Sequence, residues 1–335
     1  MKKHIRNHRP LSLLKLTAVC AALAAGAIHQ ASACTWFDFR NDQGNCFIGR
    51  TMEWPGDLQG QITVVPRDHA LGSFTTKYGF VGINHAGSVF SDGLNEHGLA
   101  CSALWLEESK YSDKKAGAYH ISELLTYVLG NTKTVDEAVA FIQTNAFYTS
   151  ANFATLAPGV TLSLHFAITD ASGRSVVVEF IDGKAQIHEN KVGAMTNDPR
   201  YEEQLKHWSK YAGKTFDEST FEAFDFSPEG KFCRMAAMNA TQAKVPTDMA
   251  GVNRTWSMIN TVDLPQGVLY WRWVNENPQF TSYAVVDDLK NRIYYFRTYD
   301  NYDIRKIDLN KIDFATVKYQ SASLFGTADY KEFKF

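Results

Sequence analysis

The sequence predicts an α+β fold in which antiparallel sheets are covered by helices that lie outside them. Short alternating runs are separated by turn residues, which is typical of hairpins and meanders. The order along the chain is strands, helices, strands, helix, strands, without the strand–helix–strand rhythm of a parallel sheet. No repeat, low-complexity tract or long linker divides residues 34–335, so we expect them to form a single domain.

Residues 1–33 have the three parts of a secretory signal peptide. They contain five basic residues and no acidic one, then an apolar stretch over Leu11–Ile28, then the small residues Ala31-Ser32-Ala33. The apolar stretch is too short and too rich in alanine for a membrane span, which needs about 20 apolar residues. We therefore predict cleavage after Ala33 and a periplasmic or secreted protein without stable membrane insertion.

Cleavage after Ala33 would make Cys34 the first residue. An N-terminal cysteine carries a thiol and a free α-amine, and the amine can act as the base for its own side chain. The alternative is a lipid-anchored, non-catalytic binding protein in which Cys34 is lipidated. That processing usually requires a leucine-like residue three positions earlier, where this chain has Ala31. The junction alone leaves both readings open.

The first part of the mature chain is predicted to consist of strands. Residues 34–40 alternate and are rich in aromatics, Asn41–Gly44 is turn material, and residues 46–54 resume as a strand, which together indicate a hairpin. Further strands are expected at 61–66, at 88–91 and, after the turn at Asn95–Gly98, at 99–106. The last of these is an apolar run typical of a buried strand.

A helical hairpin is predicted next. Apolar residues recur at helical spacing from Ile121 to Val128, and Gly130-Asn131 ends this helix. Thr134-Val135-Asp136-Glu137 is a capping box before a second helix that continues through Ile142.

A three-stranded meander and further elements follow the helical hairpin. The meander is predicted over 162–169, 175–181 and 185–189, because turn residues separate these runs. Helices are expected at 200–211 and 232–243, with a polar irregular segment at 212–231, and a last meander at 283–286, 292–298 and 304–309.

Charge and cysteine content exclude several classes of function. Removing residues 1–33 leaves 302 residues with 29 basic and 36 acidic side chains, a formal charge of −7. That charge argues against a nucleic-acid partner. The remaining cysteines, Cys34, Cys46, Cys101 and Cys233, are too scattered for a disulfide framework, and no histidine or cysteine spacing indicates a metal site.

Six segments of the chain carry a resemblance to a known family: Cys34-Thr35, Gly49–Trp54, Asp92–Leu99, His165–Asp170, Met195–Pro199 and Ile293–Phe296. They resemble the choloylglycine hydrolase family, which comprises bile salt hydrolases and penicillin V acylases. Their order and spacing are specific together, and the similarity covers essentially the whole chain after residue 33. The resemblance implies the N-terminal nucleophile hydrolase fold, a four-layer αββα sandwich of two antiparallel sheets between helices. It also implies no cofactor and a possible homo-tetramer.

The resemblance implies hydrolysis of a linear amide by the Cys34 thiol through a thioester. Arg50 matches the family's arginine beside the nucleophile, where a cation lowers the thiol pKa. Glu53 stands where the family has an aspartate that orients the α-amine. Asn197 matches an oxyanion-hole asparagine. The alternative reading of Asn197 is a helix N-cap before Pro199.

Two further positions depart from the family pattern. Trp105 stands where bile salt hydrolases have an asparagine. Gram-negative acylases of the family also differ from bile salt hydrolases at this position, so a second oxyanion donor stays unassigned. Lys231 stands at the late catalytic arginine, with Arg234 as an alternative if a loop slips. Lysine keeps the charge but loses the planar fork. We hypothesise that Glu53 and Lys231 are a coupled adjustment to a different substrate.

Aromatic residues near the proposed nucleophile predict an apolar acyl pocket. Trp54 and Trp105 are the main candidates and Trp36 and Phe80 the lesser ones, and core packing is the alternative for each. The predicted substrate is a small N-acyl amide of the penicillin V or N-acyl-homoserine lactone type. A conjugated bile salt is the alternative substrate.

Overall fold

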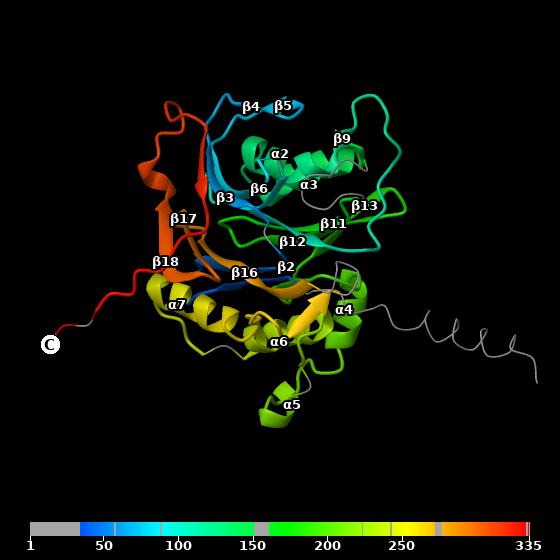
Figure 1. Cartoon of the computed structure of the whole chain (residues 1–335). Coiled ribbons are helices and arrows are strands. Elements are labelled where there is room, and N and C mark those ends of the chain that lie inside the picture. Colours follow the sequence, from blue (N-terminus) through cyan, green and yellow to red (C-terminus); the bar gives the residue numbers. More distant parts are fainter. Residues whose placement is uncertain are drawn as a thin grey trace, which may run out of the picture. The chain divides into compact units, whose positions relative to one another are not determined.

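The computed structural model describes residues 34–335 except 57, 88, 151–160, 223, 242, 272–276, 333 and 335. The predicted signal segment, residues 1–33, lies outside the described residues. The described part contains two large antiparallel sheets stacked between two sets of helices (Figure 1). The predicted α+β class and the four-layer αββα arrangement are therefore confirmed.

The first sheet carries the N-terminal hairpin at its centre and has the strand order β14-β1-β2-β16-β17-β18, with β15 beside β16. Its strands are β14 (Ala194–Thr196), β1 (Thr35–Arg40), β2 (Cys46–Pro55), β16 (Asn277–Asp288), β17 (Ile293–Thr298), β18 (Asn301–Asp308) and β15 (Leu269–Trp271). Neighbouring strands are antiparallel throughout.

The second sheet has the strand order β13-β12-β11-β8-β7-β6-β3-β19. Its strands are β13 (Lys184–Glu189), β12 (Ser175–Ile181), β11 (Leu164–Thr169), β8 (Ala100–Trp105), β7 (Val89–Asn95), β6 (Phe80–His85), β3 (Gly60–Val65) and β19 (Gln320–Ser323). Outside the two sheets lie the short pairs β4 (Ala70–Leu71) with β5 (Phe74–Thr75) and β9 (Tyr119–His120) with β10 (Phe147–Tyr148). The single-turn 3-10 helices are η1 (Ile121–Glu123) and η2 (Leu309–Lys311).

The helices cover the outer face of each sheet. α2 (Leu124–Asn131) and α3 (Val135–Thr144) lie on the second sheet, whereas α6 (Pro228–Ala240) and α7 (Asp248–Ile259) lie on the first, with α4 (Tyr201–Trp208) beside α6 (Figure 1). α5 (Glu218–Glu222) is a short helix in the connection between α4 and α6. Among the described residues, no helix has the length and apolar character needed to cross a membrane.

Apolar side chains from both sheets fill the space between them. Ile48 of β2 and Tyr283 of β16 belong to the same buried cluster as Ile83 of β6, Leu94 of β7 and Val177 of β12. A second cluster lies between the other face of the second sheet and the helices α2 and α3. The central strands of the second sheet, β6, β7, β8, β11 and β12, are therefore buried on both faces.

Most predicted elements are confirmed, and three corrections concern helices. α6 begins at Pro228, four residues before the predicted start, because Ser227 caps it by accepting from the Gly230 backbone N–H at 3.1 Å. The short α5 also lies inside the segment predicted to be irregular. The prediction contained no helix at Asp248–Ile259, where α7 forms. Gly251 in α7 lies so close to the Phe47 ring that a Cβ would clash, so packing outweighs the weak helix propensity of glycine.

Candidate active site

Cys34 lies at the end of β1, between two neighbouring strands. Thr35 pairs with Thr51 of β2 on one side and with Thr196 of β14 on the other. The Cys34 side chain is buried, and its Sγ is 3.7 Å from the Sδ of Met52 and 3.7 Å from the backbone oxygen of Glu53. The centre of the first sheet therefore fixes the position of the thiol.

Alternate residues of β2 face opposite layers of the molecule. Arg50 faces the second sheet, because its Nη2 donates to the backbone oxygen of Ala103 in β8 at 3.3 Å. Glu53 faces the helices, because its Oε1 lies 3.5 Å from the Nζ of Lys231 in α6. The two-residue period of a strand accounts for this division. Each face of β2 therefore carries one of these two buried charges.

A β-bulge in β16 supplies partners to both faces of β2. The register with β2 shifts between Thr281, which pairs with Glu53, and Tyr283, which pairs with Met52. The Thr281 hydroxyl donates to Glu53 Oε1 at 2.8 Å, whereas the Tyr283 hydroxyl accepts from Arg50 Nη1 at 2.6 Å. Residues two apart normally share one face of a strand, so the extra residue, Ser282, lets them serve opposite faces.

Arg50 is a fully buried cation whose Nη2 lies 3.7 Å from the Sδ of Met52, the same sulfur atom that the Cys34 Sγ contacts. Its Nε lies 4.0 Å from Oδ2 of Asp92, and its Cζ lies 5.2 Å from the centre of the Tyr283 ring. Burial alone would lower the pKa of Arg50, but Tyr283, Cys34 and Asp92 more than offset it, so the pKa is raised. The guanidinium therefore keeps its charge.

The Cys34 thiol is protonated at neutral pH in the chain that retains residues 1–33. Burial, and next the charge of Glu53, raise its pKa to about 11, although Arg50 and Lys231 act in the opposite direction. The nucleophile is the thiolate, so this thiol requires a base or a further positive charge to react at neutral pH.

Glu53 and Lys231 form a buried ion pair on the helical face. Both side chains have no exposed surface, and Thr281 donates a further hydrogen bond to the glutamate. Burial raises the pKa of Glu53 and lowers that of Lys231, and each partner's charge opposes the shift of the other. Arg234, the alternative to Lys231, instead donates to the backbone oxygens of Phe224 and Thr261.

Asn197 follows β14 directly and is buried beside the end of β1. Thr196 pairs with Thr35 in an antiparallel ladder. Asn197, which follows Thr196, and Cys34, which precedes Thr35, therefore lie at the same end of this ladder. The Asn197 backbone oxygen accepts from Gln204 Nε2 at 2.7 Å. The N-cap alternative is wrong, because α4 begins at Tyr201 and its N-cap residue is Arg200.

An apolar cavity between the two sheets adjoins the thiol. Cys34, Met52 and Trp54 line it from the first sheet, and Trp105 lines it from β8. Its other lining residues are Leu58, His85, Val89, Phe90, Ser91, Ala103, Leu104, Leu162 and Leu164. Trp36 and Phe80 are not among them and are fully buried in the core, where their role is packing.

The match to a protein family decides the identity of this arrangement. Residues 34–322 match the sequence model of the linear amide C–N hydrolases of the choloylglycine hydrolase family. The chain belongs to the choloylglycine hydrolase family. It is an amidohydrolase of the class that acts on linear amides, as the resemblance predicted.

Relatives within the family include both of its known activities. The penicillin V acylase of Pectobacterium atrosepticum is 28% identical, and the alignment covers 93% of this chain and 90% of that protein. A bile salt hydrolase/transferase of Clostridium perfringens is 26% identical, with 83% and 93% covered.

Solved structures share the fold. A mutant of the conjugated bile acid hydrolase from Clostridium perfringens matches with a TM-score of 0.80 and 23% identity over 90% of this chain and all of that one. The penicillin V acylase from Agrobacterium tumefaciens matches with a TM-score of 0.71 and 28% identity over 90% of this chain and 99% of that one.

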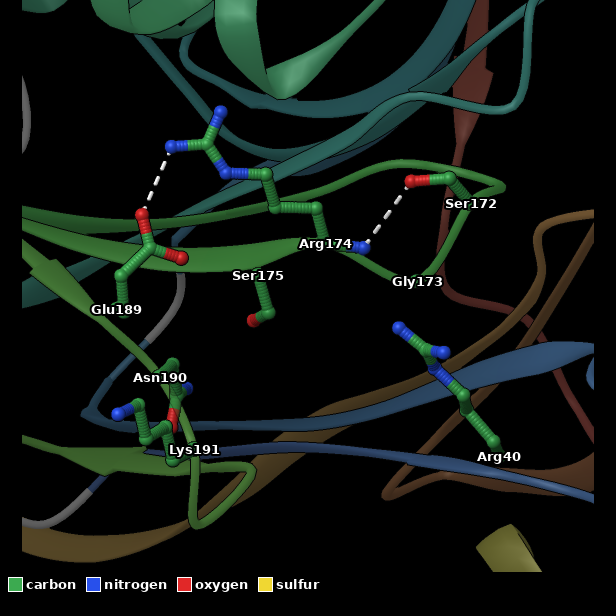
Figure 2. Close-up of a pocket in the computed structure, with 8 residues that line it drawn as sticks. All are labelled: Arg40, Ser172, Gly173, Arg174, Ser175, Glu189, Asn190 and Lys191. Carbon is green, nitrogen blue, oxygen red and sulfur yellow. Dashed lines mark hydrogen bonds and ion pairs between the residues drawn. The ribbon is translucent and has the colours of Figure 1, made fainter.

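A larger cavity lies at the opposite end of β1 and carries no cysteine. Figure 2 shows its polar lining, which includes Arg40, Arg174 and Glu189. Arg174 Nη2 donates to Glu189 Oε1 at 2.8 Å, so part of the charge is neutralised within the wall. The cavity of this choloylglycine hydrolase that contains the candidate nucleophile is therefore the smaller, apolar one.

Cys46, Cys101 and Cys233 are buried free thiols. Within the described residues no cluster of three histidine, cysteine, aspartate or glutamate side chains could hold a metal ion.

Sequence reasoning assigned no role to several residues that surround Arg50. Met52 and Asp92 belong to the family segments, so those segments were the available signal for them. Tyr283, Ser91 and His85 had no comparable signal, because their positions depend on the bulge in β16 and on how the two sheets stack.

Proposed function

We propose that residues 1–33 are removed on export and that Cys34, as the first residue, hydrolyses the linear amide of an N-acyl compound. One observation carries the proposal: the Cys34 thiol lines an apolar cavity next to the buried cation Arg50. The family match, which begins at residue 34, supports the same assignment. Export to the periplasm or beyond is part of this proposal.

In the proposed reaction the new α-amine of Cys34 accepts the thiol proton. The thiolate attacks the amide carbonyl, the side-chain amide of Asn197 donates to the resulting oxyanion, and the C–N bond then breaks. The α-ammonium returns its proton to the departing amine. A water molecule, deprotonated by the α-amine, then attacks the thioester carbonyl and the C–S bond breaks. The acid is released, and the thiolate takes back the proton from the α-ammonium. Glu53, held by Lys231 and Thr281, orients the amine.

The cavity supports an apolar acyl group as the recognised part of the substrate. Its lining is almost entirely aliphatic or aromatic, with Trp54 and Trp105 half-buried at its wall. We infer a substrate of the penicillin V or N-acyl-homoserine lactone type. The similarity to a penicillin V acylase supports this choice. A conjugated bile salt is the competing substrate, since bile salt hydrolases are also relatives.

A substrate panel on protein shown by intact mass to begin at Cys34 tests the proposal. The panel contains penicillin V, N-acyl-homoserine lactones of short and long acyl chain, and glycine-conjugated bile salts, each with the Cys34→Ser variant in parallel. We expect hydrolysis of an aryl or alkyl N-acyl substrate that the variant cleaves at least about 1,000-fold more slowly. Preference for the bile salts would replace the substrate assignment, and no Cys34-dependent hydrolysis would refute the enzyme assignment.

The same mass measurement separates hydrolase from lipid-anchored protein. A diacylglyceryl adduct on Cys34 would occupy the thiol, and an added N-acyl group would remove the free amine. An unmodified Cys34 at the N-terminus is the result that we expect.

A further inference from the structure

A chain of buried polar side chains connects Arg50 to the wall of the apolar cavity. Arg50 Nη1 donates to the Tyr283 hydroxyl at 2.6 Å. That hydroxyl lies 2.7 Å from Oγ of Ser91, and Ser91 Oγ lies 2.8 Å from Nε2 of His85. Ser91 and His85 line the cavity together with Cys34.

The hydrogen bonds of this chain run in one direction. The backbone oxygen of Leu58 can only accept, and it lies 3.3 Å from Nδ1 of His85, so Nδ1 carries the ring proton. Burial, and next the charge of Arg50, lower the pKa of His85 to about 3 and keep the ring neutral. Nε2 is therefore an acceptor, Ser91 donates to it, and Tyr283 donates to Ser91.

The hydrogen bond from Arg50 to Tyr283 opposes a second attraction, that of the Asp92 carboxylate for Arg50. The carboxylate of Asp92 lies 4.0 Å from Arg50 Nε, and Asp92 is itself held by Ser102 and by Tyr294, whose hydroxyl donates at 2.8 Å. A guanidinium without the Tyr283 hydroxyl would move towards that carboxylate, because opposite charges attract strongly in a buried site. The distance between the cation and Cys34 would then increase.

We propose that Tyr283 is a positioning residue that holds Arg50 beside the Cys34 thiol, and that Ser91 and His85 in turn orient the Tyr283 hydroxyl. The proposal rests on the proposed role of Cys34 as nucleophile. It also assigns the polar atoms of Ser91 and His85 to this chain and not to the substrate. The side chains of Ser91 and His85 therefore have no hydrogen-bond donor left to offer and favour an acyl group that is apolar where it meets these residues.

Alkylation of Cys34 in the Tyr283→Phe variant tests the proposal without any substrate. The experiment uses protein that begins at Cys34 and measures the rate of iodoacetamide labelling against pH, with the labelled peptide identified by mass. Loss of a hydrogen bond to a charged group is expected to raise the midpoint of labelling by about one pH unit. We also expect kcat/KM to fall about 10-fold at neutral pH, mainly through kcat. A failed substrate panel with a shifted midpoint would separate the two proposals.

Tyr201→Phe is the matched control. Its hydroxyl is also buried and donates to Oδ1 of Asn190 at 2.9 Å, a partner outside the group formed by Arg50 and Cys34. This variant loses a comparable hydrogen bond and is expected to keep the parent midpoint. An equal shift in both variants would show a general structural effect and would overturn the positioning role, as would an unchanged midpoint in Tyr283→Phe.

Variants of Ser91 and His85, which lie further along this series of hydrogen bonds, are expected to give a graded result. In Ser91→Ala, Tyr283 keeps His85 Nε2 as an acceptor at 3.2 Å, and in His85→Phe, Ser91 keeps the Ile83 backbone oxygen at 3.5 Å. Each single change is expected to shift the midpoint by less than half of the Tyr283→Phe value. The double variant leaves the Tyr283 hydroxyl without an acceptor and is expected to approach that value. Two independent, additive shifts would contradict the chain, and the double variant also serves if Tyr283→Phe does not fold.

Discussion

The two faces of β2 hold buried charges in different ways. Towards the second sheet, the cation Arg50 is surrounded by a neutral tyrosine hydroxyl, a backbone oxygen and a carboxylate at 4.0 Å. Towards the helices, Glu53 is paired directly with Lys231 at 3.5 Å. The first arrangement leaves the charge of Arg50 available to a neighbouring thiolate, whereas the second largely neutralises the charge of Glu53 within a pair.

This difference fits the tasks proposed for the two residues. A cation that lowers the pKa of a thiol must not be neutralised by a close carboxylate, and the Asp92 carboxylate stays 4.0 Å from Arg50 Nε, beyond hydrogen-bond distance. A carboxylate that only orients an amine works better when it is fixed, and Glu53 is fixed by a lysine and a threonine. Both arrangements depend on one strand, β16, whose bulge supplies a hydroxyl to each face.

The largest effect is expected from removing Arg50, the cation on the face of β2 that points towards the second sheet. Arg50→Gln takes the positive charge from the thiol and leaves Asp92 buried without a partner cation. We expect kcat/KM to fall at least about 100-fold, with a large rise in the pH midpoint of Cys34 alkylation. Arg254→Gln, which removes a half-buried arginine that donates to the Met238 backbone oxygen, is the control and should keep both values. A normal alkylation profile in Arg50→Gln would show that Arg50 has no part in activating the thiol.

Breaking the pair of Glu53 and Lys231, on the face of β2 that points towards the helices, is expected to lower the stability of the protein. Lys231→Met or Glu53→Gln alone leaves a buried group without its partner, which costs about 3–5 kcal/mol in the free energy of unfolding. The double variant should recover most of that loss while staying inactive. Urea unfolding of the four proteins measures this, and a double variant as unstable as the sum of the single ones would argue against a coupled pair.

Conservative changes on the same face test the hypothesis of a coupled adjustment. Glu53→Asp and Lys231→Arg each displace a charge by about the length of one bond, and such a shift can reduce a rate on the order of 100-fold. Together the two changes restore the residues that the family uses, so we expect the double variant to regain activity or to change substrate preference. Log kcat/KM values that simply add would refute the coupling.

The last effect, which appears only on acidification, concerns acid stability and the neutral His85 on the side of β2 that faces the second sheet. Its pKa is about 3 in the folded protein and 6.5 when unperturbed, so between these values the unfolded chain binds more protons. Stability therefore falls as the pH drops from 6.5 towards 3, by up to about 1.4 kcal/mol per pH unit. His85→Phe should flatten that slope, and the difference from the parent isolates His85, because buried Asp38, with a pKa raised to about 6, is common to both. An equal slope in both proteins would refute the assignment of His85 as a buried histidine that stays neutral in the folded protein.

Strands bounded by clear turn residues were predictable, whereas β6 and α7 were not. The meander of β11, β12 and β13 has turn residues at each corner, and the sequence locates it well. β6 was not predicted, because Gly82, Asn84 and His85 interrupt its apolar residues and no alternation marks it as a strand. α7 was not predicted either, because it contains Gly251 and is stabilised by packing on β2.

For the site, the sequence could place residues in order but could not place their partners. Cys34, Glu53 and Lys231 were chosen by their positions in the match to the family, and the structure brings their side chains into one buried group. The connection between Arg50 and His85 depends on a register shift at Ser282 and on the stacking of two sheets, neither of which leaves a pattern in the sequence.

Comparing two forms of the N-terminus tests the central claim most directly. One protein begins at Cys34 and the other retains Ala33, so that the thiol is the same but the α-amine of Cys34 is replaced by a peptide nitrogen. We predict that hydrolysis of the preferred N-acyl amide is at least about 1,000-fold slower in the second protein, because its thiol has lost its base. Equal rates in the two proteins would contradict the assignment of Cys34 as an N-terminal nucleophile.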